Sequence, residues 1–169
     1  FSLTEMLGFI YYKQQDFEQA YSYFDNGLKA AKKLNNTKYE ARFLRNIGLI
    51  HRDKREYRQA KEYFNMALSI QPDPEDKLRI YLSYAKLYRE MNRSDSTIFY
   101  LNMLKERISD INYSNTLRSI YEELAMYHQS NNGSISEIAQ YISAHIEDLR
   151  IKKSQSEKKA DIIHQQLEQ

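Results

Sequence analysis

The chain has 169 residues, which is enough for one compact domain or a short array of repeats that folds without stabilising cross-links. Its 25 basic and 23 acidic residues leave a formal charge of +2, a balance that excludes a strongly basic nucleic-acid binder unless the charges gather on one face. Cysteine is absent, which excludes disulfide frameworks, thiolate metal sites and cysteine nucleophiles.

No segment has the composition of a membrane span or a secretory signal, because no run approaches roughly 18 apolar residues. We therefore expect no membrane segment in this sequence, and the compartment stays open. The chain starts at Phe1 rather than at a methionine and stops at Gln169 within a helix-like pattern, so we expect it to be part of a longer protein.

Strong helix formers occur throughout, and four glycines and two prolines leave long uninterrupted stretches, so an all-α protein is predicted. Helices are expected over residues 2–14, 17–35, 38–55, 57–70, 74–91, 95–109, 115–130 and from 135 onward. Residue pairs typical of helix starts precede three of them: Thr37 with Glu40, Asp73 with Pro74, and Ser134 with Glu137.

A pattern of small and aromatic residues recurs along these helices. The first copy contains Leu7, Gly8, Tyr11, Ala20 and Phe24, and the second, 40 residues later, contains Gly48, Ala60, Phe64 and Ala67. A third copy around Ala85 follows after 37 residues, and a looser fourth around Ala125 follows after another 40. Small residues at these positions let two helices approach closely, so we expect the glycines and alanines to be buried at helix crossings.

These residues resemble the tetratricopeptide repeat, whose pattern of Leu-Gly, Tyr, Ala and Phe extends over about 34 residues. The resemblance covers about residues 4–148 and implies a right-handed α-solenoid of about four helical hairpins, with repeats at about 1–36, 37–73, 74–113 and 114–148. Residues 149–169 are then expected to form a polar helical extension that ends a long C-terminal helix and serves as a connector. The weak heptad spacing of Ala160, Ile163 and Leu167 within it would allow self-association into a homo-oligomer.

The sequence offers no arrangement typical of catalysis or of a bound cofactor. None of the four glycines forms a phosphate-binding loop, and the four histidines lack metal-ligand spacing, so we expect no enzyme activity, no cofactor and no metal. His51 and His128 occupy the position that Tyr11 fills in the first repeat, which favours a packing role. The adjacent pair Glu122-Glu123 is interpreted as part of a solvated face.

The resemblance also implies where a partner binds, because the first helix of each tetratricopeptide hairpin lines the concave face. The side chains expected in this groove are Phe9, Arg42, Arg45, Asn46, Leu49, Arg52, Arg79, Lys86 and Arg89. A basic centre beside apolar side chains suits an acidic peptide with an apolar anchor. The alternative is a solvated charged face with some internal ion pairs.

The repeat resemblance implies a scaffold that binds another protein or peptide. The order of a repeat array and a polar helix is similar to the sensor or scaffold region of bacterial signalling and regulatory proteins, which makes a sensory or regulatory module the first hypothesis. An assembly or co-chaperone-like adaptor is the second, although Glu5 stands where co-chaperone arrays carry a lysine for a carboxylate tail. An RNA-binding helical repeat is a distant third, and we expect no nucleic acid as partner.

Overall fold

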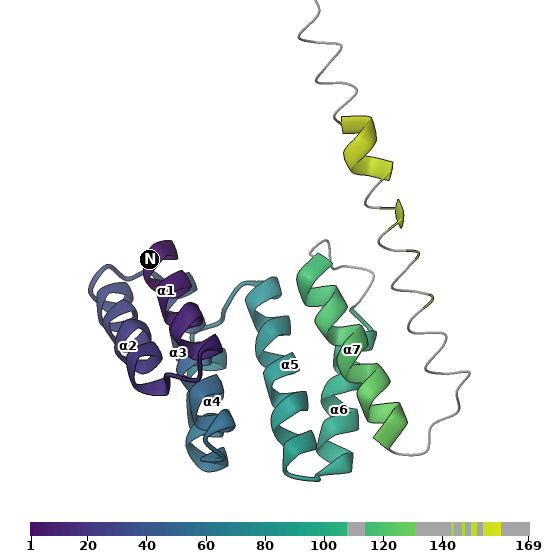
Figure 1. The fold of residues 1–169 in the computed structure, drawn as a ribbon, viewed down its shortest axis with the longest axis horizontal. Helices are drawn as coiled ribbons and strands as arrows, with labels where there is room; N and C mark the ends of the chain where they lie inside the picture. The colour runs from purple at the N-terminus through teal and green to yellow at the C-terminus, as the bar shows by residue number, and fades with distance from the viewer. Residues whose placement is uncertain (108–113, 131–142, 144–146, 148–149, 152–153, 160–169) are drawn as a thin grey trace, which may run out of the picture. The chain divides into compact units, whose positions relative to one another are not determined.

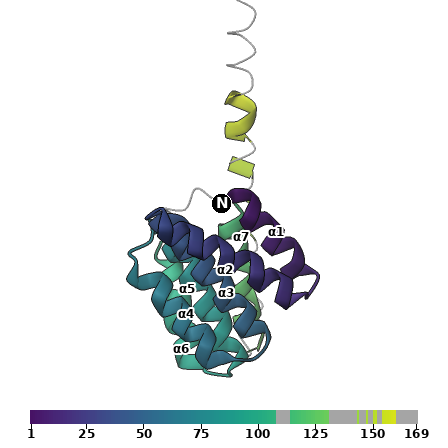
Figure 2. The same cartoon turned by 90° about the vertical axis from the view of Figure 1, so that its left-hand side faces the viewer.

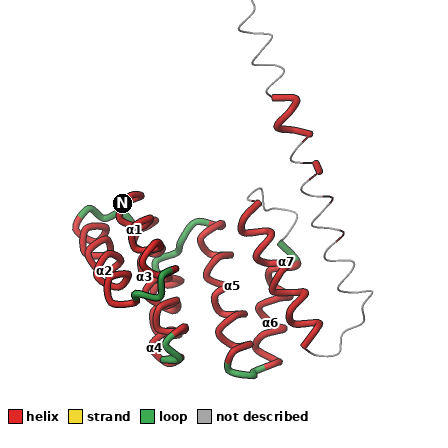
Figure 3. Tube along the Cα trace, in the orientation of Figure 1, coloured by secondary structure: helices red, strands yellow, loops and turns green. Residues whose placement is uncertain are grey.

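The computed structural model describes residues 1–107, 114–130, 143, 147, 150–151 and 154–159, and in these residues it contains helices and no strand. The helices are α1 (Ser2–Lys13), α2 (Phe17–Lys33), α3 (Thr37–Asp53), α4 (Tyr57–Ser69), α5 (Pro74–Glu90), α6 (Ser94–Lys105) and α7 (Ser114–Ser130), as Figures 1 and 3 show. The predicted all-α class is confirmed, and the predicted ends of these seven helices differ from the observed ends by a few residues at most.

The chain divides into two compact units, Phe1–Arg107 and Ile108–Gln169. In the first unit, α1 packs on α2, α3 on α4 and α5 on α6, which gives three antiparallel helical hairpins. Successive hairpins stack through contacts of α2 with α3 and of α4 with α5, and α3 also contacts α5. Figure 2 shows this unit from the side of the first hairpin. It is the stacking expected of a helical-repeat solenoid.

Side-chain caps fix the start of three helices. The carboxylate of Asp16 accepts from the amide of Gln19 at 3.1 Å, and that of Asp73 accepts from the amide of Asp76 at 2.9 Å. The predicted cap at Thr37 is wrong by one residue, because the side chain of Asn36 accepts from the amide of Tyr39 at 3.2 Å. Asparagine caps a helix at least as well as threonine. Because Asn36 is the cap, Thr37 is the first residue of the helix.

Each of the helices α1 to α5 is followed by a left-handed residue that is not glycine. Gln15, Asn35, Arg55, Gln71 and Asn92 have φ between 51° and 61°. Each follows the last turn of a helix, where this conformation lets the chain reverse and satisfies the final carbonyl groups. The reversals place consecutive helices antiparallel with short connections.

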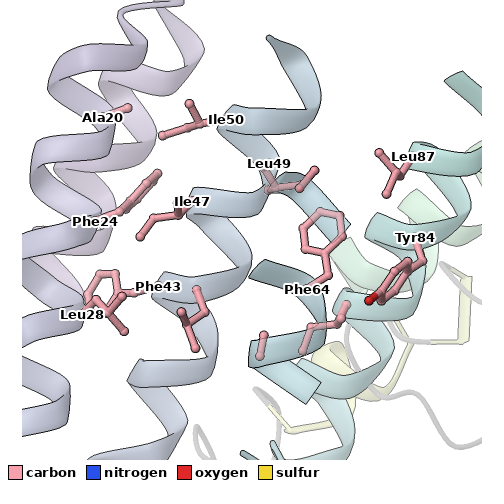
Figure 4. Packing of buried hydrophobic residues seen from close by; sticks show 14 of the residues in the cluster. Ala20, Phe24, Leu28, Phe43, Ile47, Leu49, Ile50, Phe64, Tyr84 and Leu87 are labelled. Carbon is pink, nitrogen blue, oxygen red and sulfur yellow. The ribbon is translucent and has the colours of Figure 1, made fainter. Parts of the chain in front are cut away.

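Neighbouring helices pack closely where an aromatic ring lies against a glycine. A Cβ atom on Gly8 would lie 2.3 Å from the ring of Phe24, and one on Gly48 would lie 2.5 Å from the ring of Phe64. Gly27 meets Phe43 of the next hairpin in the same way, at 2.3 Å. Figure 4 shows these phenylalanines in the core that runs through the first unit. The repeat glycines are therefore required by the packing of rings.

The alanines of the repeat pattern follow the prediction with one exception. Those at positions 20, 60, 67 and 85 have no exposed surface. Ala125 in α7 is only partly buried, so its expected burial at a helix crossing is not fully met.

A second recurring contact joins the two helices of each hairpin. The stacked rings are Tyr11 on Tyr23 with centroids 5.4 Å apart, His51 on Tyr63 at 5.1 Å, and Tyr88 on Tyr100 at 5.8 Å. The three interplanar angles are 14°, 11° and 12°. His51 therefore takes the place of a tyrosine in a packing position, as expected from its alignment.

In the second unit, α7 buries Leu117, Ile120 and Leu124. The expectation that Glu122 and Glu123 form a solvated face is wrong for Glu123, which is buried, whereas Glu122 is exposed and pairs with Arg118 at 3.3 Å. Adjacent residues on a helix point in different directions, which separates the two carboxylates. The predicted start of an eighth helix at Ser134 lies outside the described residues, while residues 154–159 are helical and exposed.

Candidate functional site

Polar side chains from the first helix of each hairpin in the first unit meet along one face, which we call the first-helix face. Its members are Glu5, Phe9 and Tyr12 of α1, Arg42, Arg45, Asn46, Arg52 and Asp53 of α3, and Glu75, Asp76, Arg79, Ser83, Lys86, Arg89 and Glu90 of α5. The face includes eight of the nine residues predicted to line a partner groove. It also includes carboxylates, as in the alternative of a charged face with internal ion pairs.

Arg42 is held by carboxylates from both neighbouring hairpins. Its Nε atom donates to both oxygens of Asp76, at 3.0 and 2.8 Å, and its Nη1 atom lies 3.9 Å from Glu5. Asp76 is almost fully buried. Burial alone would lower the pKa of Arg42, but Asp76 outweighs it and raises that pKa above its usual range. The charge of Arg42 is therefore already paired with carboxylates of the chain itself.

Arg52 is also held by carboxylates, at the other end of α3. It donates to Asp53 from Nε at 2.8 Å and from Nη2 at 2.6 Å, and its Nε atom lies 3.4 Å from Glu90. Tyr12 of α1 donates to Asp53 and accepts from Arg52 at 3.3 Å. Burial, helped by the Asp53 carboxylate, raises the pKa of the Tyr12 hydroxyl, so it stays a donor. This cluster joins three hairpins.

Arg45 lies between these two ion-pair clusters and is different. Its Nε atom donates to the backbone oxygen of Arg79 at 3.3 Å and to the hydroxyl of Ser83 at 3.1 Å, and its Nη1 atom donates to the amide oxygen of Asn46 at 3.3 Å. All three acceptors are neutral. Among the residues that the structure describes, no carboxylate forms an ion pair with Arg45.

The electrostatic setting of Arg45 disfavours its charge. Burial, followed by the guanidinium of Arg79, lowers the pKa of Arg45 to about 10, although the carboxylates of Asp76 and Glu5 oppose the shift. Arg79 itself pairs with Glu75 one turn earlier on α5. The centre of the first-helix face thus holds a half-buried cation, beside other cations, that lacks a carboxylate of its own.

The remaining predicted groove residues differ in exposure. Asn46 is fully buried and donates to Glu5 at 3.2 Å, and Leu49 is buried in the core, so neither offers a free surface to a partner. Phe9 is partly exposed and rests on Phe24 with ring centroids 5.7 Å apart. Lys86 and Arg89 are partly exposed on α5. Arg45 and Phe9 are the cationic and apolar side chains that best fit the predicted groove.

Across the described part of the chain, no group of histidine, aspartate and glutamate side chains could hold a metal ion. Within the same residues, no helix is long and apolar enough to cross a membrane.

Residues 1–73 match the family model of the tetratricopeptide repeat, and this segment contains the glycine and phenylalanine contacts of the first two hairpins. This match supports a tetratricopeptide-type repeat in residues 1–73. Tetratricopeptide repeats generally mediate protein–protein interaction and scaffolding, and their fold is typically non-catalytic.

The fold is also similar to a solved helical-repeat structure, the crystal structure of BtubC (BKLC) from P. vanneervenii. The TM-score is 0.68 at 13% sequence identity, and the match covers 90% of this chain. The chain spans 64% of the length of that structure. No curated protein matches the sequence. The likeness therefore shows an all-α helical-repeat fold.

Sequence reasoning did not assign the partners of the charged residues on the first-helix face, although the repeat period carries a signal for them. Equivalent residues of successive first helices lie side by side, and the two periods are 40 and 37 residues. The contacts of Asn46 with Glu5 and of Asp53 with Tyr12 join residues 41 apart, and that of Arg42 with Asp76 joins residues 34 apart. Each of these partners lies within about one helical turn of the position that is one repeat period away. The period would therefore have identified them.

Proposed function

We propose that the first-helix face binds a segment of another protein, and that a carboxylate of this segment pairs with Arg45. The observation that carries the proposal is the difference among the arginines of α3, since Arg42 and Arg52 are neutralised by the chain itself and Arg45 contacts neutral oxygens. A carboxylate at Arg45 would form charge-assisted hydrogen bonds in a partly desolvated setting, where they are strong.

The partner is further defined by the neighbours of Arg45. Phe9 is the partly exposed apolar side chain of the face, so an apolar residue of the segment would rest there. Glu5, Asp53 and Glu90 belong to the face and would repel a segment with many acids. The proposed ligand therefore has one or two carboxylates and an apolar anchor, and is not a long acidic tail.

This picture disfavours a co-chaperone clamp for acidic tails. The carboxylate of Glu5 occupies the position of a clamp lysine, and it is bonded to Asn46 and lies near Arg42. We propose instead that the array is the sensory or regulatory interaction module of a larger signalling or transcription-regulating protein. The support is the exposed helical segment at residues 154–159, which fits a connector rather than a packed element.

The binding proposal can be tested with two pools of fluorescent peptides. One pool places a single aspartate or glutamate near a leucine or phenylalanine, and the other replaces that acid with asparagine or glutamine. Fluorescence anisotropy should show about tenfold tighter binding of the acidic pool, since a charge-assisted bond contributes about 1.5–3 kcal/mol. Equal binding of both pools, or none, would contradict a carboxylate site.

A further inference from the structure

A second surface on α1 consists of residues that are not part of the first-helix face, and we call it the outer face of α1. It consists of Leu3, Met6, Leu7 and Ile10, at the i, i+3, i+4, i+7 spacing of one apolar helix face. Leu3 is 69% exposed, Met6 59% and Ile10 50%. Within the part of the chain that the structure describes, these three are among the most exposed large apolar side chains.

The role of this face can be inferred from the repeat, because the equivalent positions on α3 and α5 are covered by another helix. Leu3, Leu7 and Ile10 correspond, 40 residues later, to Phe43, Ile47 and Ile50 of α3, and 37 residues after those to Ile80, Tyr84 and Leu87 of α5. All six of these later residues are buried. The same positions are therefore core in α3 and α5 and surface in α1.

The covering element is in both cases the second helix of the preceding hairpin. Phe43 of α3 lies against Phe24 and Gly27 of α2, with ring centroids 6.4 Å apart in the first contact. Figure 4 shows Ile47 and Ile50 of α3 directed toward α2. Tyr84 of α5 meets Phe64 of α4 at 5.3 Å. A helix with an aromatic residue and a small residue one turn later thus covers each of these faces.

Helices that end a solenoid carry a polar outer face, because nothing stacks on them. The outer face of α1 is apolar, like the face of an internal first helix. We propose that it packs against the second helix of a further hairpin of the same repeat, stacked ahead of α1 as α2 is stacked on α3. The proposed occupant is amphipathic and carries a phenylalanine-like residue followed after three positions by glycine or alanine, the pattern of Phe24 with Gly27 and of Phe64 with Ala67.

This inference is independent of peptide binding at Arg45, since it rests on other residues and another contact. It is tested by repeating residues 1–40 once ahead of Phe1 in the full chain. The insertion preserves the period of 40 and places the added copy of α2 over α1. Hydrogen exchange at the amides of the original Leu7 and Ile10 should slow by about tenfold or more, and the unfolding midpoint should rise.

The matched control is the Leu3→Lys/Ile10→Lys double variant, made in the original copy of the extended chain and in the 169-residue chain. In the extended chain the gain in protection should disappear. In the 169-residue chain the midpoint should barely change, because both side chains are exposed. Unchanged exchange on extension would overturn the proposal. So would a dimer of the 169-residue chain in sedimentation that the double variant abolishes, since a second copy would then be the occupant.

Discussion

Arg45 donates a hydrogen bond to the backbone oxygen of Arg79 at 3.3 Å, although the two guanidinium groups repel each other. The bond links α3 to α5 and holds Arg45 between two clusters of paired charges. Its neighbours Arg42 and Arg52 are each bound to carboxylates of the chain. Among these three arginines of α3, Arg45 is thus the one that is held by neutral groups.

The first prediction concerns the close packing of Gly48. In the Gly48→Ala variant the new Cβ atom would lie 2.5 Å from Phe64 and 3.3 Å from the backbone oxygen of Ala60. We expect a loss of about 1–3 kcal/mol in the free energy of unfolding, measured by urea denaturation. In a Phe64→Leu background the same change should cost clearly less, because the ring is gone. Equal costs in both backgrounds would show that the ring is not the obstacle.

The second prediction concerns the left-handed residue Arg55, which has a φ of 61°. Glycine adopts this conformation without the steric cost that a Cβ atom brings, so Arg55→Gly should stabilise the protein by about 0.5–1 kcal/mol. Asn35 has a φ of 51° and is a residue type that tolerates the conformation, so Asn35→Gly should gain less. The unfolding midpoints of both variants, measured by thermal denaturation, test this expectation. A larger gain in stability for Asn35→Gly than for Arg55→Gly would refute the explanation.

The third prediction concerns the cap of α5. Asp73→Ala removes the acceptor for the amide of Asp76 and should cost about 1 kcal/mol near neutral pH, whereas Asp73→Asn keeps an acceptor and should cost less. Urea denaturation of the two variants measures the difference. A cost for Asp73→Asn as large as that for Asp73→Ala would argue against the capping role.

The same cap has a defined pH dependence. Burial alone would raise the pKa of Asp73, but the amide of Asp76 and the ammonium of Lys38 outweigh it and hold that pKa below 3.8. A carboxylate with a depressed folded-state pKa stabilises above its unfolded-state value and loses this contribution as the pH falls through the folded-state value. The stability difference between wild type and Asp73→Asn should therefore shrink below about pH 3.8. A difference that stays constant down to pH 2 would contradict the assigned pKa.

Much of the fold follows from the sequence because the repeat pattern has a direct steric cause. A glycine in one helix and a phenylalanine in the next recur together, as in Gly8 with Phe24 and Gly48 with Phe64, so their positions predict which helices touch. The start of α3 could not be assigned to the residue, since Asn36 and Thr37 are both good caps and only the local backbone decides between them.

The candidate site was less predictable because exposure and pairing depend on neighbouring hairpins. A first helix position facing the groove was expected to be open, yet Asn46 and Leu49 are covered by α1 and by the core respectively. Sequence spacing identified the arginines but could not rank them, since Arg42, Arg45 and Arg52 differ only in which carboxylates reach them. That ranking required the geometry of three hairpins together.

The role of Arg45 predicts that binding and stability separate. Arg45→Met removes a partly buried cation and keeps a flexible apolar side chain, so the free energy of unfolding should rise or stay within about 0.5 kcal/mol of the wild type. Arg58→Met is the matched control, because Arg58 is exposed on α4 and pairs with Glu62 away from the first-helix face. A large loss of stability in Arg45→Met alone would assign Arg45 a structural role instead.

The most direct test of a carboxylate site at Arg45 is the affinity of one acidic peptide, selected from the pool with a single acid, for three proteins measured by isothermal titration calorimetry. The wild type and Arg58→Met should bind it equally, and Arg45→Met should bind it about tenfold or more weakly while remaining folded. Equal affinity of Arg45→Met and the wild type would contradict the account and place the partner's carboxylate elsewhere.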